Sequence, residues 1–397
     1  MDIWGLIKIH KKNLSGKIFL FMAAVFLSAI LLEFTLRFFY PQLTLERGEK
    51  LSVQIYEKST YTPWRHKPNS TGSMISPYGM EYDVPVKINS YGLRGDDFSM
   101  AKGKNSHRIL FLGDSFTFGV GVSLEDTYPK KLEALLNRGK PAYAYEAINA
   151  GFGDGGYTTD VQYLYLREKG LKFRPDAVVV GVFIGNDISD MNKNIWLRND
   201  SGGLPTNITS DYQYVDENRR LRIHYTNESY YERYGILGKI DYIMSKKSHL
   251  FIFLKNTAIR KTYKPEKIFL RQIPEDSMRN IDKMKILIME MKKISSRNNA
   301  DFIAVLIPPR TQVWDYEWER YTDAYRELNT SRSMPQELFM DFCRSYNITC
   351  IDLLPEFLKN AGKGGLYFPI DGHWNEEGHQ LAAGVIFQNL VNLRILN

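Results

Sequence analysis

The sequence is short of cysteine, and it contains only one long apolar run. Two cysteines in 397 residues exclude a disulfide-rich scaffold. Cys343 and Cys350 flank a predicted helix-to-strand turn, where either a single disulfide or two buried thiols would fit. The seven histidines show no metal-ligand spacing with acidic or cysteine partners, so we expect no metal. No internal repeat or low-complexity tract is present, and 44% hydrophobic with 24% charged residues is the composition of a folded protein.

The one long apolar run lies near the N-terminus. Residues 18–32 are uninterruptedly apolar, and with the next residues to 40 they are long enough to span a bilayer as a helix. A cleaved signal peptide is the alternative, but no small-x-small cleavage site follows the run. Four lysines precede the run and place the N-terminus in the cytoplasm by the positive-inside rule: Lys8, Lys11, Lys12 and Lys17.

These features predict a cytoplasmic tail at 1–17, a transmembrane anchor at 18–40 and an extracytoplasmic remainder, in a bacterial periplasm or on a cell surface. Since the remainder lies outside the cytoplasm, nucleic acid is not an expected partner. Residues 41–106 are mixed in character and predict a lead-in or linker with short strands, whose role the sequence does not indicate.

From residue 107 onward, strand-like and helix-like segments alternate. The apolar strand-like runs are 109–112, 145–149, 177–183, 302–307 and 349–353. The helix-like stretches are 128–137, 159–169, 278–297, 335–346 and 375–393. This alternation predicts an α/β fold with a mainly parallel sheet covered by helices on both faces.

An insertion at about 190–275 interrupts the alternation. Residues 193–271 hold 15 Lys and Arg against 8 Asp and Glu, an excess equal to the net charge of the whole chain. A compact domain does not contain a structureless connection of this length, so we expect an inserted cap. Its composition fits either a solvated basic face or a surface for an anionic or sugar ligand or anionic lipid heads. The aromatic residues are Trp196, Tyr212, Tyr214, Tyr225, Tyr230, Tyr231, Tyr234 and Tyr242.

A Gly-Asp-Ser string at 113–115 follows the first predicted strand. Open α/β sheets carry their chemistry at the carboxyl ends of the strands, so the hydroxyl of Ser115 is a candidate nucleophile. Gly, Asp and Ser are also ordinary turn residues, and the string alone is a weak signal.

Three further segments supply the other groups that acyl transfer needs. Asp371 and His373 lie two residues apart, which would place both side chains on one side of an extended segment. In such a pair the carboxylate can hold the imidazole in one tautomer and stabilise its charged form, so that the other ring nitrogen can take a proton from a serine. Gly151 and Asn186 each follow a predicted strand and offer a backbone N–H and a side-chain amide for an oxyanion.

Taken together and in this order, these blocks resemble the SGNH (GDSL-type) hydrolase superfamily. The matching blocks are residues 113–122, 148–151, 185–187 and the Asp-x-His of 371–373. The resemblance covers roughly residues 107–395, apart from the insertion, and implies a three-layer αβα, flavodoxin-like fold.

The resemblance also implies a role for each residue and no cofactor. Ser115 matches the nucleophile, His373 the general base and Asp371 its orienting partner. The backbone N–H groups of Ser115 and Gly151 and the side chain of Asn186 match the oxyanion hole. In the common family pattern Asp stands three residues before His. Here Asp371 stands two residues before His373, and the D-x-H-W form resembles the alginate and peptidoglycan O-acetyltransferase relatives.

The sequence therefore predicts a membrane-anchored serine esterase or O-acyltransferase that acts on acyl, most simply acetyl, esters of a cell-envelope or surface polysaccharide. Its expected partners are an acylated glycan or acyl donor and, for a transferase, a multi-pass acyl-exporting membrane protein. The alternatives are a non-catalytic glycan-binding scaffold and a lipid esterase.

Overall fold

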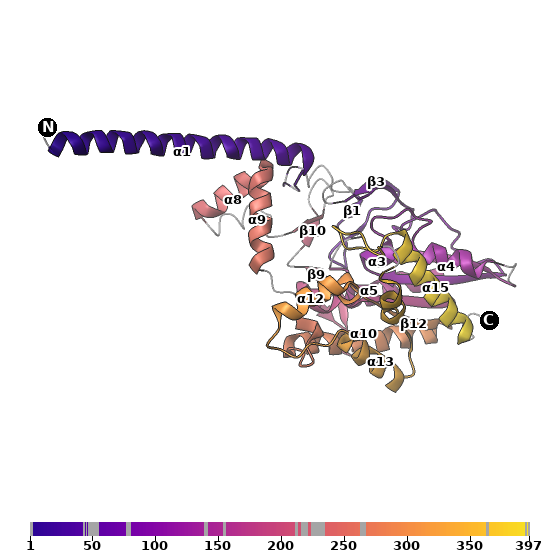
Figure 1. Ribbon diagram of the computed structural model, residues 1–397. Coiled ribbons are helices and arrows are strands. Elements are labelled where there is room, and N and C mark those ends of the chain that lie inside the picture. Colours follow the sequence, from indigo (N-terminus) through magenta and orange to yellow (C-terminus); the bar gives the residue numbers. More distant parts are fainter. Residues whose placement is uncertain are drawn as a thin grey trace. The chain divides into compact units, whose positions relative to one another are not determined.

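The computed structural model describes the chain except residues 1–2, 43, 45, 47–54, 77–80, 139–141, 154–155, 211–212, 216–220, 224–234, 263–266, 363–364, 394 and 396–397. It contains two compact units (Figure 1). The helical unit comprises Met1–Leu51 and Glu228–Tyr263. The sheet unit comprises Ser52–Asn227 and Lys264–Asn397.

The centre of the sheet unit is a five-stranded parallel sheet. Its strands are β5 (Ser106–Gly113), β6 (Ala144–Gly151), β7 (Ala177–Phe183), β12 (Asp301–Ile307) and β13 (Thr349–Asp352). Their spatial order is β13-β12-β7-β5-β6, with every neighbouring pair parallel. Numbered along the chain this is the order 2-1-3-4-5 of flavodoxin-like folds, in which the direction of winding reverses between β5 and β7.

The sheet is covered on both faces because side chains alternate along each buried strand. Leu110 and Leu112 belong to the core that contains α5 (Thr159–Glu168), α10 (Glu275–Arg297) and α13 (Met334–Ser345). Ile109 and Phe111 belong to the opposite core, with α4 (Tyr128–Leu136), α14 (Leu354–Asn360) and α15 (Glu376–Asn392). Figure 1 shows α10 and α13 on one side of the sheet and α4 and α15 on the other. The predicted α/β fold, with all five strand runs in one sheet, is confirmed.

The remaining elements of the sheet unit are short. They are β1 (Tyr56–Glu57), β2 (Arg65–His66), β3 (Ser70–Ile75), β4 (Asp83–Ile88), α3 (Ser115–Phe118), α6 (Asp187–Asp190), β8 (Asn194–Asn199), β9 (Pro205–Ser210), β10 (Gln213–Val215), β11 (Leu221–Ile223), α11 (Arg310–Val313) and α12 (Asp315–Ala324), with single 3-10 turns at Gly170–Phe173, Met191–Lys193 and Lys267–Phe269. Cys343 and Cys350 are free thiols, the first buried and the second half-buried.

The lead-in segment is built into the sheet unit by a buried arginine. The guanidinium of Arg94 donates to the backbone carbonyls of Phe118, Gly119 and Val122 at 2.6–2.7 Å. It also lies 5.0 Å from the centre of the Phe118 ring. Burial lowers the pKa of Arg94 to about 10, so the side chain stays charged at neutral pH. Arg94 thus holds the segment that directly follows Ser115.

We expect Arg94→Ala to lower the free energy of unfolding by about 3 kcal/mol or more, because three carbonyls lose a charged donor. Arg297→Ala, which removes an exposed arginine at the end of α10, is the matched control and should change stability by less than about 0.5 kcal/mol. Thermal or urea unfolding of both variants measures the difference. Equal losses in the two variants would contradict a fixing role for Arg94.

The predicted insertion at 190–275 is divided between the two units. Its first part forms the β8–β9 and β10–β11 hairpins of the sheet unit. There the indole N–H of Trp196 donates to the buried Asp160 of α5 at 2.8 Å, so this ring packs on the fold. Its second part, Glu228–Tyr263, belongs to the helical unit, and the last residues, from Lys264, belong to the sheet unit again. Tyr212, Tyr225, Tyr230, Tyr231 and Tyr234 lie outside the described residues.

The helical unit contains α1 (Ile3–Phe39), α8 (Gly235–Lys247) and α9 (His249–Thr262). Within α1, residues Gly16–Phe39 are long and apolar enough to cross a membrane, and of these residues only Leu36 is buried by the protein. A signal sequence would have the same length and composition.

Candidate active site

Ser115 lies at a sharp strand-to-helix turn. β5 ends at Gly113, and a side chain at Gly113 would place its Cβ 2.0 Å from the hydroxyl of Thr117. Asp114 caps the next helix by accepting the N–H of Phe116 at 3.0 Å, and Ser115 is the first residue of that helix, α3. The half-buried hydroxyl of Ser115 therefore stands at the carboxyl edge of the sheet, beside the reversal between β5 and β7.

The structure brings three predicted residues into one hydrogen-bonded line. The Nε2 atom of His373 lies 2.7 Å from the Oγ atom of Ser115. The Nδ1 atom of the same ring bonds to the carboxylate of Asp371. The side chain of His373 is 24% exposed and that of Asp371 is 9% exposed, so the base is reachable and its partner is sheltered. This is the arrangement in which a serine hydroxyl can lose its proton to an imidazole.

The backbone between Asp371 and His373 is a turn and not the extended segment that the spacing suggested. Gly372 has a φ of +91°, in the left-handed region that favours glycine. The Phe368 N–H donates to the His373 carbonyl at 2.8 Å, and the Gly372 N–H donates to the Phe368 carbonyl at 2.9 Å. The turn, closed by these bonds, brings the two side chains together.

Two residues of the lead-in segment support this turn. The hydroxyl of Tyr82 donates to the carboxylate of Asp371 at 3.0 Å. The carboxylate of Glu81 accepts the backbone N–H groups of Ile370 and Asp371 at 2.7 and 2.8 Å. Burial raises the pKa of Asp371, but the charge of His373 and the hydrogen bonds from His373 and Tyr82 outweigh it and leave the pKa below its ordinary value. Asp371 is therefore ionised at neutral pH and can stabilise a charged imidazole.

The predicted oxyanion donors are only partly free in this structure. The backbone N–H of Gly151 donates to the side-chain oxygen of Asn149 at 3.0 Å. The side-chain amide of Asn186 donates to Asp190 at 2.7 Å, which uses one of its two hydrogens. Gly151 also has a packing reason to be glycine, since a Cβ there would lie 2.3 Å from the backbone nitrogen of Phe118. The amide of Asn186 is held in place and still has one hydrogen that could bind an oxyanion. The backbone N–H of Gly151 would have to give up its hydrogen bond to Asn149 before it could bind one.

Two buried acids lie beneath the site and brace its turns. Burial raises the pKa of Asp114 to about 6, and burial together with the charge of Asp114 raises the pKa of Asp187 well above its ordinary value. Asp187 accepts the N–H of Phe183 at 2.9 Å. Among the described residues, no group of three His, Cys, Asp or Glu side chains is placed to hold a metal ion.

His379, six residues after His373, is packed and not presented to the site. Its Nδ1 atom accepts the backbone N–H of Tyr128 at 3.2 Å, and it is 1% exposed. Burial lowers its pKa to about 3. The unfolded chain therefore binds a proton at this residue between about pH 6.5 and 3, whereas the folded chain does not, and stability is lost as pH falls through that window.

We expect His379→Gln, which keeps an acceptor for Tyr128, to weaken the acid-side loss of stability. The dependence of the free energy of unfolding on pH should shrink by up to about 1.4 kcal/mol per pH unit between pH 6 and 4. Urea unfolding over that range measures this change, with His107→Gln as the control at a half-buried histidine. Parallel pH profiles for His379→Gln and the wild type would contradict the argument.

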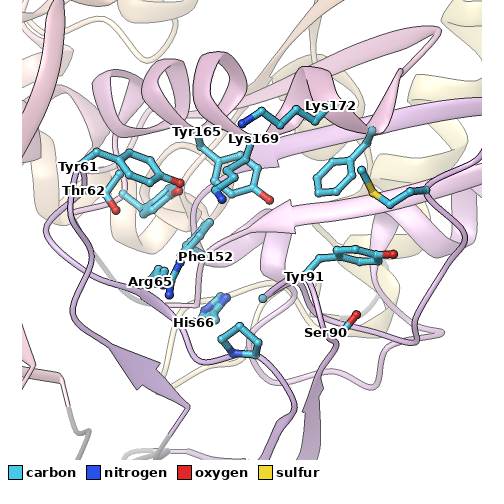
Figure 2. A pocket seen from close by; sticks show the side chains of 15 residues that line it. Tyr61, Thr62, Arg65, His66, Ser90, Tyr91, Phe152, Tyr165, Lys169 and Lys172 are labelled. Carbon is cyan, nitrogen blue, oxygen red and sulfur yellow. The ribbon is translucent and has the colours of Figure 1, made fainter.

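A cavity of about 270 Å³ lies beside Phe152, the residue after Gly151 (Figure 2). Tyr61, Tyr91, Phe152, Tyr157, Tyr165 and Phe173 give it aromatic walls. Arg65, Lys169 and Lys172 also line it, and no acidic side chain of the described residues does. The hydroxyl of Tyr165 is buried and has no hydrogen-bond partner among the described residues. The cavity thus combines apolar ring surfaces with positive charge.

The strand order is that of a flavodoxin-like α/β fold. Tyr82, Glu81 and Arg94 complete the site in this fold, and sequence reasoning missed all three. They lie in a segment of mixed composition, and Tyr82 is 289 residues from its partner, so no local pattern points to them.

Solved structures similar to this chain include a member of the lipolytic G-D-S-L family from Veillonella parvula, at 13% identity over 71% of this chain and 97% of that one, with a TM-score of 0.36. A two-domain esterase active on acetylated mannans is 16% identical over 73% and 50%, with a TM-score of 0.36. An acetyl xylan esterase is 16% identical over 71% and 98%, with a TM-score of 0.35. Neither a family model nor a curated protein sequence matches the chain.

Proposed function

We propose that this protein is a membrane-anchored serine esterase or O-acyltransferase that acts on acetyl esters of a cell-envelope polysaccharide. The observation that carries the proposal is the hydrogen-bonded line from Ser115 through His373 to Asp371 at the carboxyl edge of the sheet. Since this arrangement needs only proton transfer and a positioned nucleophile, no metal or cofactor enters the reaction.

In the first half of the reaction, the Nε2 atom of His373 takes the proton of the Ser115 hydroxyl while Oγ bonds to the ester carbonyl carbon. Asp371 stabilises the imidazolium that forms. The tetrahedral oxyanion then collapses, the bond to the alcohol oxygen breaks, and the alcohol leaves with the proton from His373. The acyl group is now an ester of Ser115.

In the second half, a hydroxyl group attacks the carbonyl carbon of the acyl-enzyme and passes its proton to His373. The bond between the acyl carbon and the Oγ atom of Ser115 then breaks, and His373 returns the proton to that oxygen. Water as the acceptor makes the protein an esterase, and a sugar hydroxyl makes it a transferase. A transferase would also need an acyl donor outside the cytoplasm, which an acyl-exporting membrane protein could supply. The resemblance of the D-x-H-W segment to O-acetyltransferases is the feature that favours this second outcome.

Within the proposal, Asn186 supplies an oxyanion donor through the amide hydrogen that Asp190 does not occupy. We expect Asn186→Ala to lower kcat on the order of a hundredfold with a small change in KM, because the donor acts mainly in the transition state. Asn360→Ala, which removes an amide that bonds within its own helix, is the control. A kcat for Asn186→Ala within threefold of wild type would show that the oxyanion is held elsewhere.

A polysaccharide substrate is supported by the cavity beside Phe152. The half-buried rings of Tyr61 and Tyr91 suit the faces of sugars, and the exposed Lys169 and Lys172 suit a sugar that carries a negative charge.

Retention of the N-terminal helix as an anchor is supported by its contacts in the helical unit. Glu33 and Arg37, which follow the apolar run, bond to the backbone at residues 247–250. Removal of α1 as a signal peptide would leave these backbone groups without their partners.

The full chain in detergent tests the function. Wild type and Ser115→Ala are given 4-nitrophenyl acetate with and without de-acetylated envelope polysaccharide fragments, and acetate release and acetylated sugar are both measured. Release by wild type alone supports the esterase, and acetylated sugar from wild type alone supports the transferase. Equal rates for the two proteins would contradict both and favour a non-catalytic binding domain.

A further inference from the structure

The helix α8 exposes its apolar side. Its large aliphatic residues repeat at intervals of one, three and four, which places them on a single face of an α-helix. They are Ile236, Leu237, Ile240, Ile243 and Met244, and each is between 40% and 78% exposed.

The opposite side of α8 is small or polar, and this is the side that packs. Gly238 and Ser245 are buried. Asp241 on the same side pairs with Lys255 of α9 at 2.6 Å. A helix of a water-soluble protein packs its apolar face and exposes its polar one, so the orientation of α8 is inverted. An apolar medium is needed to cover the exposed face.

Both helices of this hairpin are fixed to the end of the apolar segment of α1 (Figure 1). The carboxylate of Glu33 caps α9, because it accepts the backbone N–H groups of His249 and Leu250 at 3.0 and 2.7 Å. Arg37 donates to the carbonyl of Lys247, the last residue of α8, at 3.2 Å. Glu33 and Arg37 lie in the last turns of the proposed span at 18–40, so these bonds hold the α8–α9 turn near the end of the span, where it approaches the membrane interface.

The length and the charge of α8 suit that position. With 13 residues it is about 20 Å long, too short to cross a bilayer but long enough to lie along its surface. Lys239 and Lys246 are exposed at one edge of the apolar face. Lysines there can extend their ammonium groups to lipid phosphates while their stems stay with the acyl chains.

We propose that α8 lies in the membrane interface beside α1, with its apolar face among the lipid acyl chains, as a second membrane attachment. This rests on the proposed anchor function of α1. The chain passes between the two units at residues 51–52, 227–228 and 263–264, so three segments connect the sheet unit to the attached helices.

Depth-dependent quenching tests the proposal in the full chain. Single cysteines replace Leu237 or Ile240 in a Cys343→Ala, Cys350→Ala background, carry a bimane label and are placed in phosphatidylcholine–phosphatidylglycerol vesicles with brominated acyl chains. Phe26→Cys reports on the anchor, and Tyr346→Cys reports on an exposed aromatic position of the sheet unit. Ester turnover within twofold of the unlabelled background shows that each variant is folded.

We expect the labels at 237 and 240 to be quenched at least threefold more than the label at 346. Quenching at 26 but not at 237 or 240 would overturn the attachment of α8 and leave the anchor intact; a second copy of the chain covering the face would give this result. Quenching at 237 and 240 but not at 26 would support α8 and contradict the anchor. Quenching at none of the three positions would overturn both.

Discussion

Replacing Ser115 by alanine is expected to lower kcat for a small acetyl ester on the order of 10⁴-fold or more, with little change in stability. The Oγ atom of Ser115 is the atom that forms the acyl-enzyme, and the Nε2 atom of His373 lies 2.7 Å from it. In the alanine variant His373 has no serine hydroxyl to activate at this position. Alanine fits the first turn of α3, since the cap of that helix comes from Asp114 and not from Ser115. Initial rates with 4-nitrophenyl acetate measure the loss.

Ser123→Ala is the matched control for this prediction. Its hydroxyl bonds only to the nearby Asp126, at the start of the loop before α4. We expect its kcat to stay within twofold of wild type. Comparable rates for Ser115→Ala and Ser123→Ala would show that ester cleavage occurs at another group or without the proposed covalent step.

Asp371→Asn is expected to lower kcat on the order of 10⁴-fold while leaving the fold intact. An amide has nearly the same size as the carboxylate, but it is neutral and can present an N–H to the ring nitrogen. His373 would then be held in the wrong tautomer, and its charged form would lose the carboxylate that stabilises it. The pH profile of kcat and thermal unfolding together separate this effect from a loss of structure.

The control for Asp371 is Asp352→Asn. Asp352 caps α14 by accepting the N–H of Leu354 at 2.9 Å, and burial raises its pKa to about 6. A neutral side chain at this position costs little, so kcat should stay within a few fold of wild type. If Asp371→Asn were as active as Asp352→Asn, the orienting role of Asp371 would be wrong, and Tyr82 or Glu81 alone would hold the turn.

The sequence predicts the sheet and the order of the site residues well because both depend on local patterns. A fully buried parallel strand is a short apolar run, and all five runs are strands of the sheet. Ser115 and Asn186 follow strands β5 and β7, which are neighbours in the sheet, so their proximity follows from the strand order.

The parts that the sequence does not predict depend on contacts between distant residues. Tyr82 reaches Asp371 and Arg94 clamps the segment after Ser115, yet neither residue lies in a periodic or motif-bearing stretch. The division of the insertion has the same cause, because the bonds of Glu33 to α9 link residues more than 200 positions apart. The backbone N–H of Gly151 already donates to the side chain of Asn149. The motif therefore predicts where Gly151 lies, but it does not predict whether its N–H is free to bind an oxyanion.

Trapping the acyl-enzyme tests the account most directly. The full chain is mixed with 4-nitrophenyl acetate, quenched in acid during turnover, digested and examined by mass spectrometry. The account predicts one acetyl group on the peptide that contains Ser115, attached to the Ser115 oxygen and absent from Ser115→Ala. An acetyl group on another residue that turns over at the rate of catalysis, or full activity with no acetyl group on Ser115, would contradict the account.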